Sequence, residues 1–381
     1  MIRPRHIAMR LHLWLGLSLG AVLVLAGLTG SVLVFYVEID ALLHPQQASQ
    51  GTANAASYDA AIPALRKAFP DKHGPWRIEV TGKAGAIPVR YYNPTETAGR
   101  AFAPMMVWLS ADGTRVLRRD YWGDYAMTWI YDLHYRLQLG KLGGVLFGYA
   151  GLAILVLLIS GLLSWWPRGS IAKALRFKRR ASASRRLRDI HKLAGLTSLP
   201  LLIMFTLTGV MLALPEESNA VLAPVFGTVQ PMPLPVSRAL NGPQISPATA
   251  IAAAKAAIPA ARLAWIEVPA PGDGAYRLRM QQAGDPSRRF PHSFVWIDQH
   301  DGTVLASQDS ASFPALSVIN KWLHPLHDGS AGGIVLRIVA AMAGLLPAEL
   351  FVTGLVRWKN RRRPRQSVAI SARRTSPRSR R

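Results

Sequence analysis

Four long apolar blocks, each bounded by polar sequence, stand out along the chain. Residues 11–37, 142–166 and 193–215 contain no Asp, Glu, Lys or Arg, and residues 329–356 contain only two such side chains. Since a helix of about 20 apolar residues crosses the hydrocarbon core of a bilayer, this pattern predicts a membrane protein with four transmembrane helices.

The blocks repeat one another. A shift of 179 positions aligns His12 with His191 and Thr29-Gly30 with Thr208-Gly209, without a gap. A second gap-free match, at a shift of 193 positions, aligns His134 with His327, Gly161 with Gly354 and Trp165 with Trp358. Internal repeats fix an architecture before any single element does. The expected fold class is therefore membrane α-helical, with four transmembrane helices arranged as two parallel repeats.

The two segments between the paired blocks follow one pattern. Each has a stretch with helical spacing, followed by short alternating runs typical of strands and by an Asp-Gly turn. The strand-like runs are 76–80, 87–92 and 105–109 in the first segment and 265–268 and 294–297 in the second, where 265–268 echoes 76–80. A helix on a small antiparallel sheet buries the apolar face of such a segment, so we expect two small α+β domains.

The net charge of +24 is confined to particular segments. Residues 167–192 hold ten Lys or Arg against one Asp, and residues 357–381 hold eleven with no acid. This placement follows the positive-inside rule and argues against nucleic acid as a partner, although the same clusters attract anionic membrane lipid. It predicts a bacterial inner-membrane protein with both termini in the cytoplasm.

The expected boundaries follow from the blocks and the charge. Cytoplasmic segments are 1–10, 167–190 and 359–381; transmembrane helices are 11–37, 134–166, 191–215 and 324–358; periplasmic segments are 38–133 and 216–323.

The chain contains no cysteine. This excludes disulfides, cysteine-ligated iron–sulfur clusters, thiol catalysis and covalent c-type haem. No glycine-rich phosphate fingerprint follows a strand, so the sequence does not predict a built-in nicotinamide or flavin domain.

Several motifs together resemble the PepSY-associated transmembrane family. They are the His-Trp-Leu-Gly start at His12, the His-Lys-Leu-Ala-Gly start at His191, the Leu-His elements at His134 and His327, and the Thr-Gly and Ser-Gly positions that precede Trp. The resemblance covers nearly all of residues 1–360. It implies that the two extramembrane segments are PepSY-like domains. The size and four-helix layout are similar to those of family members that are dihaem ferric-siderophore reductases of the bacterial inner membrane.

The four repeat-related histidines are the candidate ligands. The predicted topology places His12 and His191 near the cytoplasmic side and His134 and His327 at the outer level. Two imidazoles that face one another across a bundle can occupy both axial positions of a haem iron, which predicts two b-type haems. His324 is a reserve ligand for the outer site. The alternative interpretation is that these histidines cap helix ends or lie among lipid headgroups.

The length of the second helix raises a difficulty. A straight helix from His134 to Trp165 measures roughly 46 Å, which places the histidine outside the ~30 Å hydrocarbon core. Either a bend at Gly143-Gly144 and Gly332-Gly333 brings the histidines inward, or the outer haem lies above the bilayer. Both alternatives remain open.

Cations near the histidines are candidate partners for haem propionates. Arg10 and Lys192 are near the inner pair, and Arg136, Lys141 and Arg337 are near the outer pair. Arg337 could equally extend its charged end to the membrane surface. Glu349 could pair with another helix, take part in proton handling or contact a quinol.

Aromatic residues precede His134. Trp122, Tyr125 and Trp129 form either an aromatic belt at the membrane surface or, together with Trp322, a platform on which an organic iron chelate docks.

The expected function is a haem-dependent reductase that passes electrons outward to a periplasmic ferric siderophore and releases Fe(II). The electron donor would be a quinol or a separate reductase. Three alternatives are a haem or metal sensor without turnover, a non-catalytic regulator and a siderophore carrier. A haem spectrum would favour the reductase or the sensor, whereas its absence would favour the regulator or the carrier.

Overall fold

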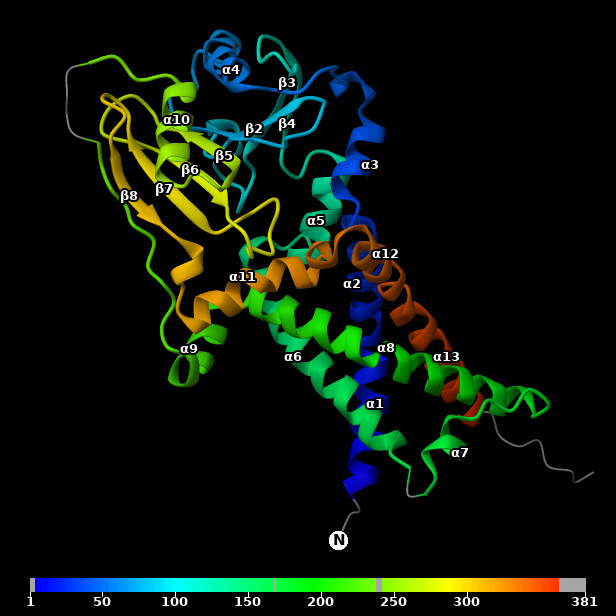
Figure 1. The fold of residues 1–381 in the computed structure, drawn as a ribbon. Coiled ribbons are helices and arrows are strands. Elements are labelled where there is room, and N and C mark those ends of the chain that lie inside the picture. The colour runs from blue at the N-terminus through cyan, green and yellow to red at the C-terminus, as the bar shows by residue number, and fades with distance from the viewer. Residues whose placement is uncertain (1–3, 168, 238–241, 363–381) are drawn as a thin grey trace, which may run out of the picture.

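The computed structural model describes residues 4–167, 169–237 and 242–362. Figure 1 shows two layers: a bundle of long helices, and a β-sheet flanked by short helices at one end of that bundle. Helices α5 (Ala126–Arg136) and α11 (Ala315–His327) lie between the two layers. These two helices carry the outer histidines.

Three apolar helices of the described chain are long enough to cross a membrane. They are α6 (Gly140–Trp165), α8 (Ala183–Ala213) and the segment Ser330–Arg361, which contains α12 (Gly333–Ala343) and α13 (Leu346–Arg362). A fourth crossing results if α1 (Pro4–Ser18) and α2 (Gly20–Leu33) form one span. The chain is therefore a multi-pass membrane protein.

The first span is bent, whereas residues 11–37 were expected to form one helix. α1 and α2 meet at 59°. Ser18 lies at the bend and donates its hydroxyl to the carbonyl of Trp14 at 2.8 Å, and Gly20 follows it. A serine and a glycine close together in a helix are a recognised cause of sharp kinks, and here only Leu19 separates them. The helix ends at Leu33, and α3 (Tyr36–Leu43) continues outside the span.

Small residues allow the helices to approach closely. A Cβ on Gly27 would lie 2.3 Å from the carbonyl oxygen of Gly344, and a Cβ on Gly344 would lie 2.5 Å from that of Gly27. Beside this contact Ser31 donates to the carbonyl of Ala341 at 2.7 Å. In membranes such contacts replace the hydrophobic driving force between helices, and here they join α2 to the last span.

The second span begins at Gly140, not at His134. Leu137 and Gln138 have φ values of 51° and 59°, so α5 ends there and α6 starts in a new direction. Gly143 does not form the bend that the sequence suggested. Its role is close packing, because a Cβ there would lie 1.7 Å from the carbonyl oxygen of Arg136.

The fourth span is broken in the same way. α11 ends at His327, and Gly329 and Gly333 have φ values of 76° and 60°. Both outer histidines therefore belong to short helices packed against the ends of the spans. The remaining helices are α4 (Ala55–Ala68), α7 (Ile171–Leu175), α9 (Pro215–Phe226) and α10 (Pro247–Ala257).

The two extramembrane segments, expected as two small domains, are joined into one antiparallel sheet. Its order is β4-β3-β2-β1-β5-β6-β7-β8. The strands are β1 (Trp76–Glu79), β2 (Ile87–Tyr91), β3 (Met105–Leu109), β4 (Val116–Tyr121), β5 (Arg262–Val268), β6 (Ala275–Gln281), β7 (Ser293–Asp298) and β8 (Val304–Gln308). The halves meet where β1 pairs with β5, with Ile78 opposite Ile266.

One face of this sheet forms the main core. Alternate strand residues such as Ile78, Ile266 and Leu278 pack against Leu65 of α4 and Ala254 of α10 in one buried cluster that includes both halves. The other face is directed toward the membrane helices (Figure 1). Residues such as Arg77, Trp265 and Arg279, which alternate with the core residues along the same strands, lie on that face.

Candidate functional site

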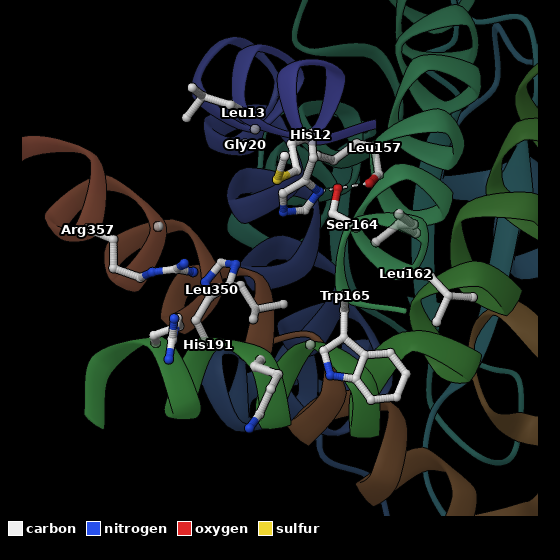
Figure 2. A pocket seen from close by; sticks show the side chains of 18 of the residues that line it. His12, Leu13, Gly20, Leu157, Leu162, Ser164, Trp165, His191, Leu350 and Arg357 are labelled. Carbon is white, nitrogen blue, oxygen red and sulfur yellow. Dashed lines mark hydrogen bonds between the residues drawn. The ribbon is translucent and has the colours of Figure 1, made fainter. Parts of the chain in front are cut away.

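The four predicted histidines gather as two pairs. The ring centroids of His12 and His191 are 6.2 Å apart, and those of His134 and His327 are 6.1 Å apart. Figure 2 shows the first pair, with the two rings presented to one another by α1 and α8. Two imidazoles that bond one metal at about 2 Å on opposite sides have centroids separated by about 6.3 Å. Both pairs have the spacing of axial ligands.

Hydrogen bonds fix the tautomer of the outer histidines. Nδ1 of His134 lies 2.8 Å from the Thr29 hydroxyl oxygen, and that hydroxyl donates its own hydrogen to the carbonyl of Leu25 at 2.6 Å. The threonine oxygen can therefore only accept, so Nδ1 carries the proton. Thr208 holds His327 in the same way, at 3.0 Å. The Nε2 lone pair of each ring is left for a ligand, as in most histidine–metal sites.

The inner histidines are held by related contacts. Nδ1 of His191 donates to the Thr353 hydroxyl at 2.8 Å, and that hydroxyl donates to the carbonyl of Glu349. Nδ1 of His12 donates directly to the carbonyl of Leu157 at 3.1 Å. Ser160 occupies the repeat position of Thr353, and its hydroxyl bonds that same carbonyl at 2.9 Å. Both inner rings also keep Nε2 free.

A glycine lies against each histidine ring. Cβ atoms built on Gly161, Gly209, Gly30 and Gly354 would lie 2.8, 3.0, 3.1 and 3.4 Å from Cε1 of His12, His327, His134 and His191, respectively. Each glycine directly follows a Thr or Ser of the hydrogen-bonding set. Thr29-Gly30, Thr208-Gly209 and Thr353-Gly354 thus hold their histidines through both residues, whereas Ser160-Gly161 contacts His12 through its glycine alone. The sequence showed these dipeptides as repeat positions, and the repeat was the signal for their role.

The two pairs lie at opposite ends of the bundle. His191 is near the start of α8, and Gly209, which contacts His327, is near its end. At 1.5 Å per residue these positions are about 27 Å apart, within the ~30 Å thickness of a hydrocarbon core. The difficulty of a 46 Å helix disappears because α5 and α11 fold back onto the spans.

A large cavity opens at the inner pair. Its volume is about 1230 Å³. Gly16 and Gly195, each one turn beyond a histidine, leave flat walls on both sides of it. Basic side chains line it as well: Arg5, Arg10, Arg185, Arg188, Lys192, Arg357 and Arg361. Apolar walls, flat glycine surfaces and several cations suit a planar macrocycle with carboxylate substituents.

The predicted inner cations differ in availability. Lys192 is already bonded to Asp189 at 3.2 Å and to the carbonyl of Ala174 at 2.7 Å. Arg10 has no side-chain partner in the described chain and lines the cavity. Arg357, which the sequence analysis did not single out, extends toward the histidines (Figure 2). Arg10 and Arg357 are thus the better propionate candidates.

The predicted outer cations are largely engaged elsewhere. Arg337 forms a bidentate ion pair with Glu38, with both distances 2.8 Å, and donates to the carbonyl of Val34 at 2.6 Å. It fixes the break between α2 and α3, where its guanidinium group is bound by Glu38 and by the Val34 carbonyl. Arg136 lies 3.9 Å from Asp132. Lys141 and Glu349 are exposed, without side-chain partners among the described residues.

His324 is not part of the outer pair. Its Nδ1 lies 3.2 Å from a carboxylate oxygen of Asp328, and its ring packs on Phe290 with centroids 5.6 Å apart. His327, three residues later, faces His134. The geometry thus favours His327 as the outer ligand. His324, the reserve ligand, instead packs against the β6–β7 loop.

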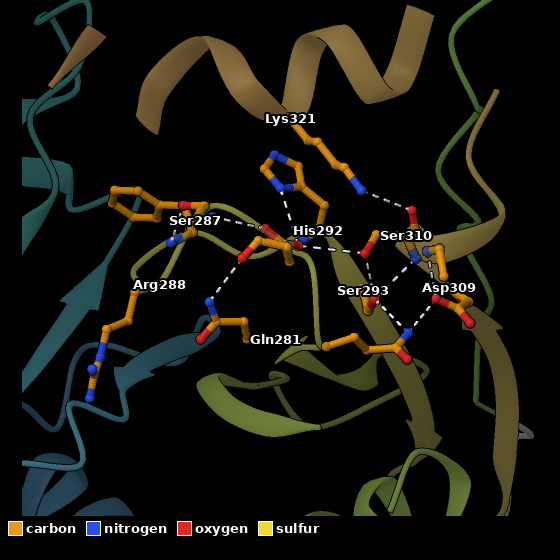
Figure 3. A network of polar contacts seen from close by, with 12 residues as sticks. Gln281, Ser287, Arg288, His292, Ser293, Asp309, Ser310 and Lys321 are labelled. Atoms are coloured by element: carbon orange, nitrogen blue, oxygen red, sulfur yellow. Dashed lines mark hydrogen bonds and ion pairs between the residues drawn. The ribbon is translucent and has the colours of Figure 1, made fainter. Parts of the chain in front are cut away.

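A buried polar network holds α11 to the sheet (Figure 3). Lys321 of α11 donates to the carbonyl of Ser310 at 3.3 Å, and the Ser310 hydroxyl bonds that of Ser293 at 3.0 Å. Asp285 accepts from the backbone N–H groups of Ser287 and His292 at 3.0 and 2.7 Å. The network connects the β6–β7 loop to the helix that presents His327.

The predicted aromatic platform is partly wrong. Trp122 and Tyr125 are each only 6 % exposed. The indole N–H of Trp122 donates to Asp132 at 3.1 Å, and the Tyr125 hydroxyl bonds that of Tyr36 at 2.7 Å. They pack the space between the sheet and α5. Trp129 and Trp322, at 50 % and 38 % exposure, remain at the surface.

Each histidine pair offers only two protein ligands among the described residues. Among residues 4–167, 169–237 and 242–362, no group of three or more His, Cys, Asp or Glu side chains could hold a metal. A bare zinc or copper ion needs three or four protein ligands, whereas haem iron needs only the two axial ones. Two imidazoles in each pair, with free Nε2 atoms, fit b-type haem.

Comparison with known proteins agrees with this architecture. The model of the PepSY-associated TM region matches residues 9–361. An uncharacterised protein of Pseudomonas aeruginosa is 29% identical over 261 residues, which cover 62% of this chain and 64% of that protein. The match thus spans less than two thirds of the relative's own length. With the family model covering nearly the whole chain, this protein belongs to the PepSY-associated transmembrane family.

Proposed function

We propose that this protein is an inner-membrane dihaem b reductase, with cytoplasmic termini, that transfers electrons across the membrane to a periplasmic ferric siderophore and so releases Fe(II). The observation that carries the proposal is the pair of matched histidine sites. Each has centroids about 6 Å apart, and every Nδ1 is hydrogen-bonded. A carrier or a non-catalytic regulator would not require such paired, oriented histidines.

The chain supplies position and environment for the chemistry. When bound, haem b provides one-electron redox chemistry. His12 and His191 would hold one group and His134 and His327 the other. The three threonine hydroxyls and the Leu157 carbonyl orient the imidazoles and raise their basicity. Arg10 and Arg357 would compensate propionate charge in the cavity.

The basic loops support this direction. By the positive-inside rule, ten Lys or Arg in residues 167–192 and eleven in residues 357–381 favour the cytoplasmic side. The His12 site then faces the cytoplasm and the His134 site faces the sheet domain. Electrons would enter from a quinol or a separate cytoplasmic reductase and leave beneath the sheet domain. Reduction to Fe(II) weakens binding by hard oxygen chelators.

The first test is the haem content of the purified full-length protein. We expect two haems per chain, both low-spin. Dithionite-reduced protein mixed anaerobically with a ferric siderophore should reoxidise, and ferrozine should report Fe(II). The gallium complex of the same siderophore should bind without reoxidation.

Purified protein without a Soret band would overturn the proposal. Two haems that stay reduced with every ferric chelate tried would leave a haem protein with another electron acceptor. Reporter fusions after Arg176 should show cytoplasm and those near Gly99 should show periplasm. The reverse result would contradict the direction.

A further inference from the structure

We propose that the membrane-directed face of the β-sheet is the docking surface for the chelate, and that it selects anionic iron chelates. The role of the chelate as electron acceptor rests on the proposed function. The binding of the chelate to this face does not. The surface, called the arginine face below, consists of Arg77, Arg90, Arg277, Arg279 and Arg289 with the aromatic rings between them.

Strand pairing brings these arginines together. Arg77 lies directly opposite Arg90, and Arg279 lies opposite Trp265 in the register of β5 and β6. Their neighbours along each strand, such as Ile78 and Leu278, point into the main core. The arginines therefore all project from the other face. Arg289 joins them from the β6–β7 loop, where it pairs with Glu79 of β1 at 3.0 Å.

The positive charge of the face exceeds its negative charge. Five arginines stand against two glutamates, Glu79 and Glu267, which leaves an excess of three. Arg77, Arg277 and Arg289 have ion pairs, that of Arg77 with Glu267 at 3.7 Å, but no carboxylate pairs with Arg90 or Arg279 in the part of the chain that the structure describes. Buried charges are normally paired, so the face lacks an anion that a ligand could supply.

The two unpaired arginines are not simply solvated. Arg90 is only 9 % exposed, and Nε of Arg279 is buried without a hydrogen-bond partner. Burial, with Arg77 and Arg277 nearby, lowers the pKa of Arg279 to about 9, so the group remains charged at neutral pH. Although burial raises the pKa of the Tyr92 hydroxyl, Arg77 and Arg90 beside it bring that pKa below its ordinary value. The local field is thus positive.

Aromatic rings lie between the arginines on the same face. The guanidinium carbon of Arg90 lies 5.0 Å from the ring centre of Trp265, and that of Arg279 lies 4.8 Å from the ring centre of Phe294. These contacts hold the guanidinium groups in place without neutralising them. Fixed guanidinium groups bind carboxylate and other oxyanions through paired N–H donors. Rings between them suit the organic part of a chelate.

The face is continuous with the outer histidine helices. Arg90 lies 5.9 Å from the ring centre of Trp122, whose ring packs on Tyr131 of α5 with centroids 5.1 Å apart. Tyr131 is one helical turn before His134. On the other side Phe290 packs on His324 of α11. A chelate at the arginine face would therefore lie next to both helices that present the outer site.

Binding of redox-inert gallium complexes to the full-length protein tests this inference apart from electron transfer. We expect an anionic catecholate complex, gallium–enterobactin, to bind more tightly than the cationic gallium–desferrioxamine B complex. Higher salt should weaken its binding. Arg279→Gln and Arg90→Gln should each weaken it about tenfold, as expected for one charge-assisted hydrogen bond. Arg279→Lys should retain part of the affinity.

Arg119→Gln is the matched control. Arg119 is exposed on β4 and lies opposite Val107, which belongs to the main core, so it projects from the other face of the same sheet. The control should bind gallium–enterobactin as the wild type does. An unchanged haem spectrum and circular dichroism spectrum would show that the Arg279 and Arg90 variants are folded.

The outcomes separate this inference from the proposed function. Unchanged affinity in folded Arg279→Gln and Arg90→Gln, or tighter binding of the cationic complex, would overturn the inference. Haem reoxidised by cationic ferric chelates alone would do the same while leaving the reductase intact. Anionic binding that depends on Arg279 in a protein without haem would keep the arginine face and remove the reductase.

Discussion

The inner and outer histidine pairs have nearly equal spacing, 6.2 and 6.1 Å, but are built differently. The outer pair is symmetric: two short helices present the rings, and two threonines hold them at 2.8 and 3.0 Å. The inner pair lies on α1 and α8 themselves. There one ring is held by a threonine and the other by a backbone carbonyl.

This difference suggests where each site tolerates change. At the outer site the side-chain acceptors carry the orientation of both rings, so each threonine matters. At the inner site the Leu157 carbonyl cannot be removed by a side-chain substitution, and the cavity beside the rings leaves space. We therefore expect the outer pair to be the more sensitive to point changes and the inner pair the more adaptable.

The largest effect should follow removal of a ligand. Alanine in place of His134 or His327 should reduce the haem content from two to one per chain, with loss of the outer signal. Alanine in place of His12 or His191 should remove the other signal. The pyridine haemochrome assay measures this. His324→Ala should keep both haems, because its ring contacts Asp328 and Phe290; loss of a haem there would undo the assignment to His327.

Removal of the acceptors should come next. Thr29→Val, Thr208→Val and Thr353→Val keep the side-chain shape but leave Nδ1–H without its acceptor, so haem affinity should fall by about 10–100-fold. Ser160→Ala should leave affinity near that of the wild type, because the Leu157 carbonyl still accepts from His12.

Thr197→Val is the control for the acceptor series, since the Thr197 hydroxyl bonds only carbonyls of its own helix. Competition with apomyoglobin for haem gives the affinities. Equal losses in the Ser160 and Thr353 variants would contradict the proposed asymmetry of the inner pair.

The four ring-contacting glycines provide a graded series. Gly161→Ala should disturb its site most, because the new Cβ would lie 2.8 Å from Cε1 of His12. Gly30→Ala and Gly209→Ala should be intermediate and similar, and Gly354→Ala, at 3.4 Å, the mildest. Overpacking of this kind costs about 1–3 kcal/mol, or roughly tenfold in affinity.

Electron paramagnetic resonance of the low-spin haems would report ring displacement in the glycine series. Gly144→Ala is the control, since its Cβ would meet only ordinary contacts, 3.8 Å from the carbonyl oxygen of Tyr135 and 3.9 Å from Cγ of Arg136. A ranking unrelated to these distances would show that the glycines serve helix packing alone.

The smallest expected effect is a change in the outer site at acidic pH. Burial raises the pKa of Asp285, but hydrogen bonds from His292 and Ser287 lower it by more, so this pKa lies below its ordinary value. A depressed carboxyl pKa stabilises the fold above the unfolded value of about 3.9 and loses that contribution as pH falls through the folded pKa. Below about pH 4 the network under α11 should therefore weaken, and the outer haem signal should change before the inner one.

Asp285→Asn should flatten this acid dependence while lowering stability at neutral pH. The optical spectra recorded during a pH titration would follow both haems. An inner signal that changes first would contradict the link between the network and α11.

Some of this structure was predictable from the sequence and some was not. The histidine pairing followed from the repeat, because equivalent positions in parallel repeats lie at one depth. The break after α11 was predicted at Gly332-Gly333, and Gly333 has a φ of 60°, whereas the break before α6 lies ahead of the predicted Gly143-Gly144. Leu137 and Gln138 adopt positive φ without being glycine, so only Gly140, with a φ of 61°, marks the first break in the sequence.

Long-range contacts explain the other structural features that the sequence did not predict. The pairing of β1 with β5 joins residues nearly 190 positions apart, and no local pattern reports it. The echo of 76–80 in 265–268 gave no sign of this pairing, in which Ile78 lies opposite Ile266. Trp122 was predicted to lie in an aromatic belt or on a docking platform. Its burial depends on Tyr36 and Phe102, which lie elsewhere in the sequence.

The Ile78–Ile266 pair lies where the two halves of the sheet meet, and the chain reverses direction across it as equivalent strands do across a two-fold axis. Each histidine pair also takes one ring from each half. Neither half of the chain could therefore form either site alone, and both sites exist only because the two halves are joined. The two halves are nevertheless free to differ in detail, as Ser160 and Thr353 do at equivalent positions.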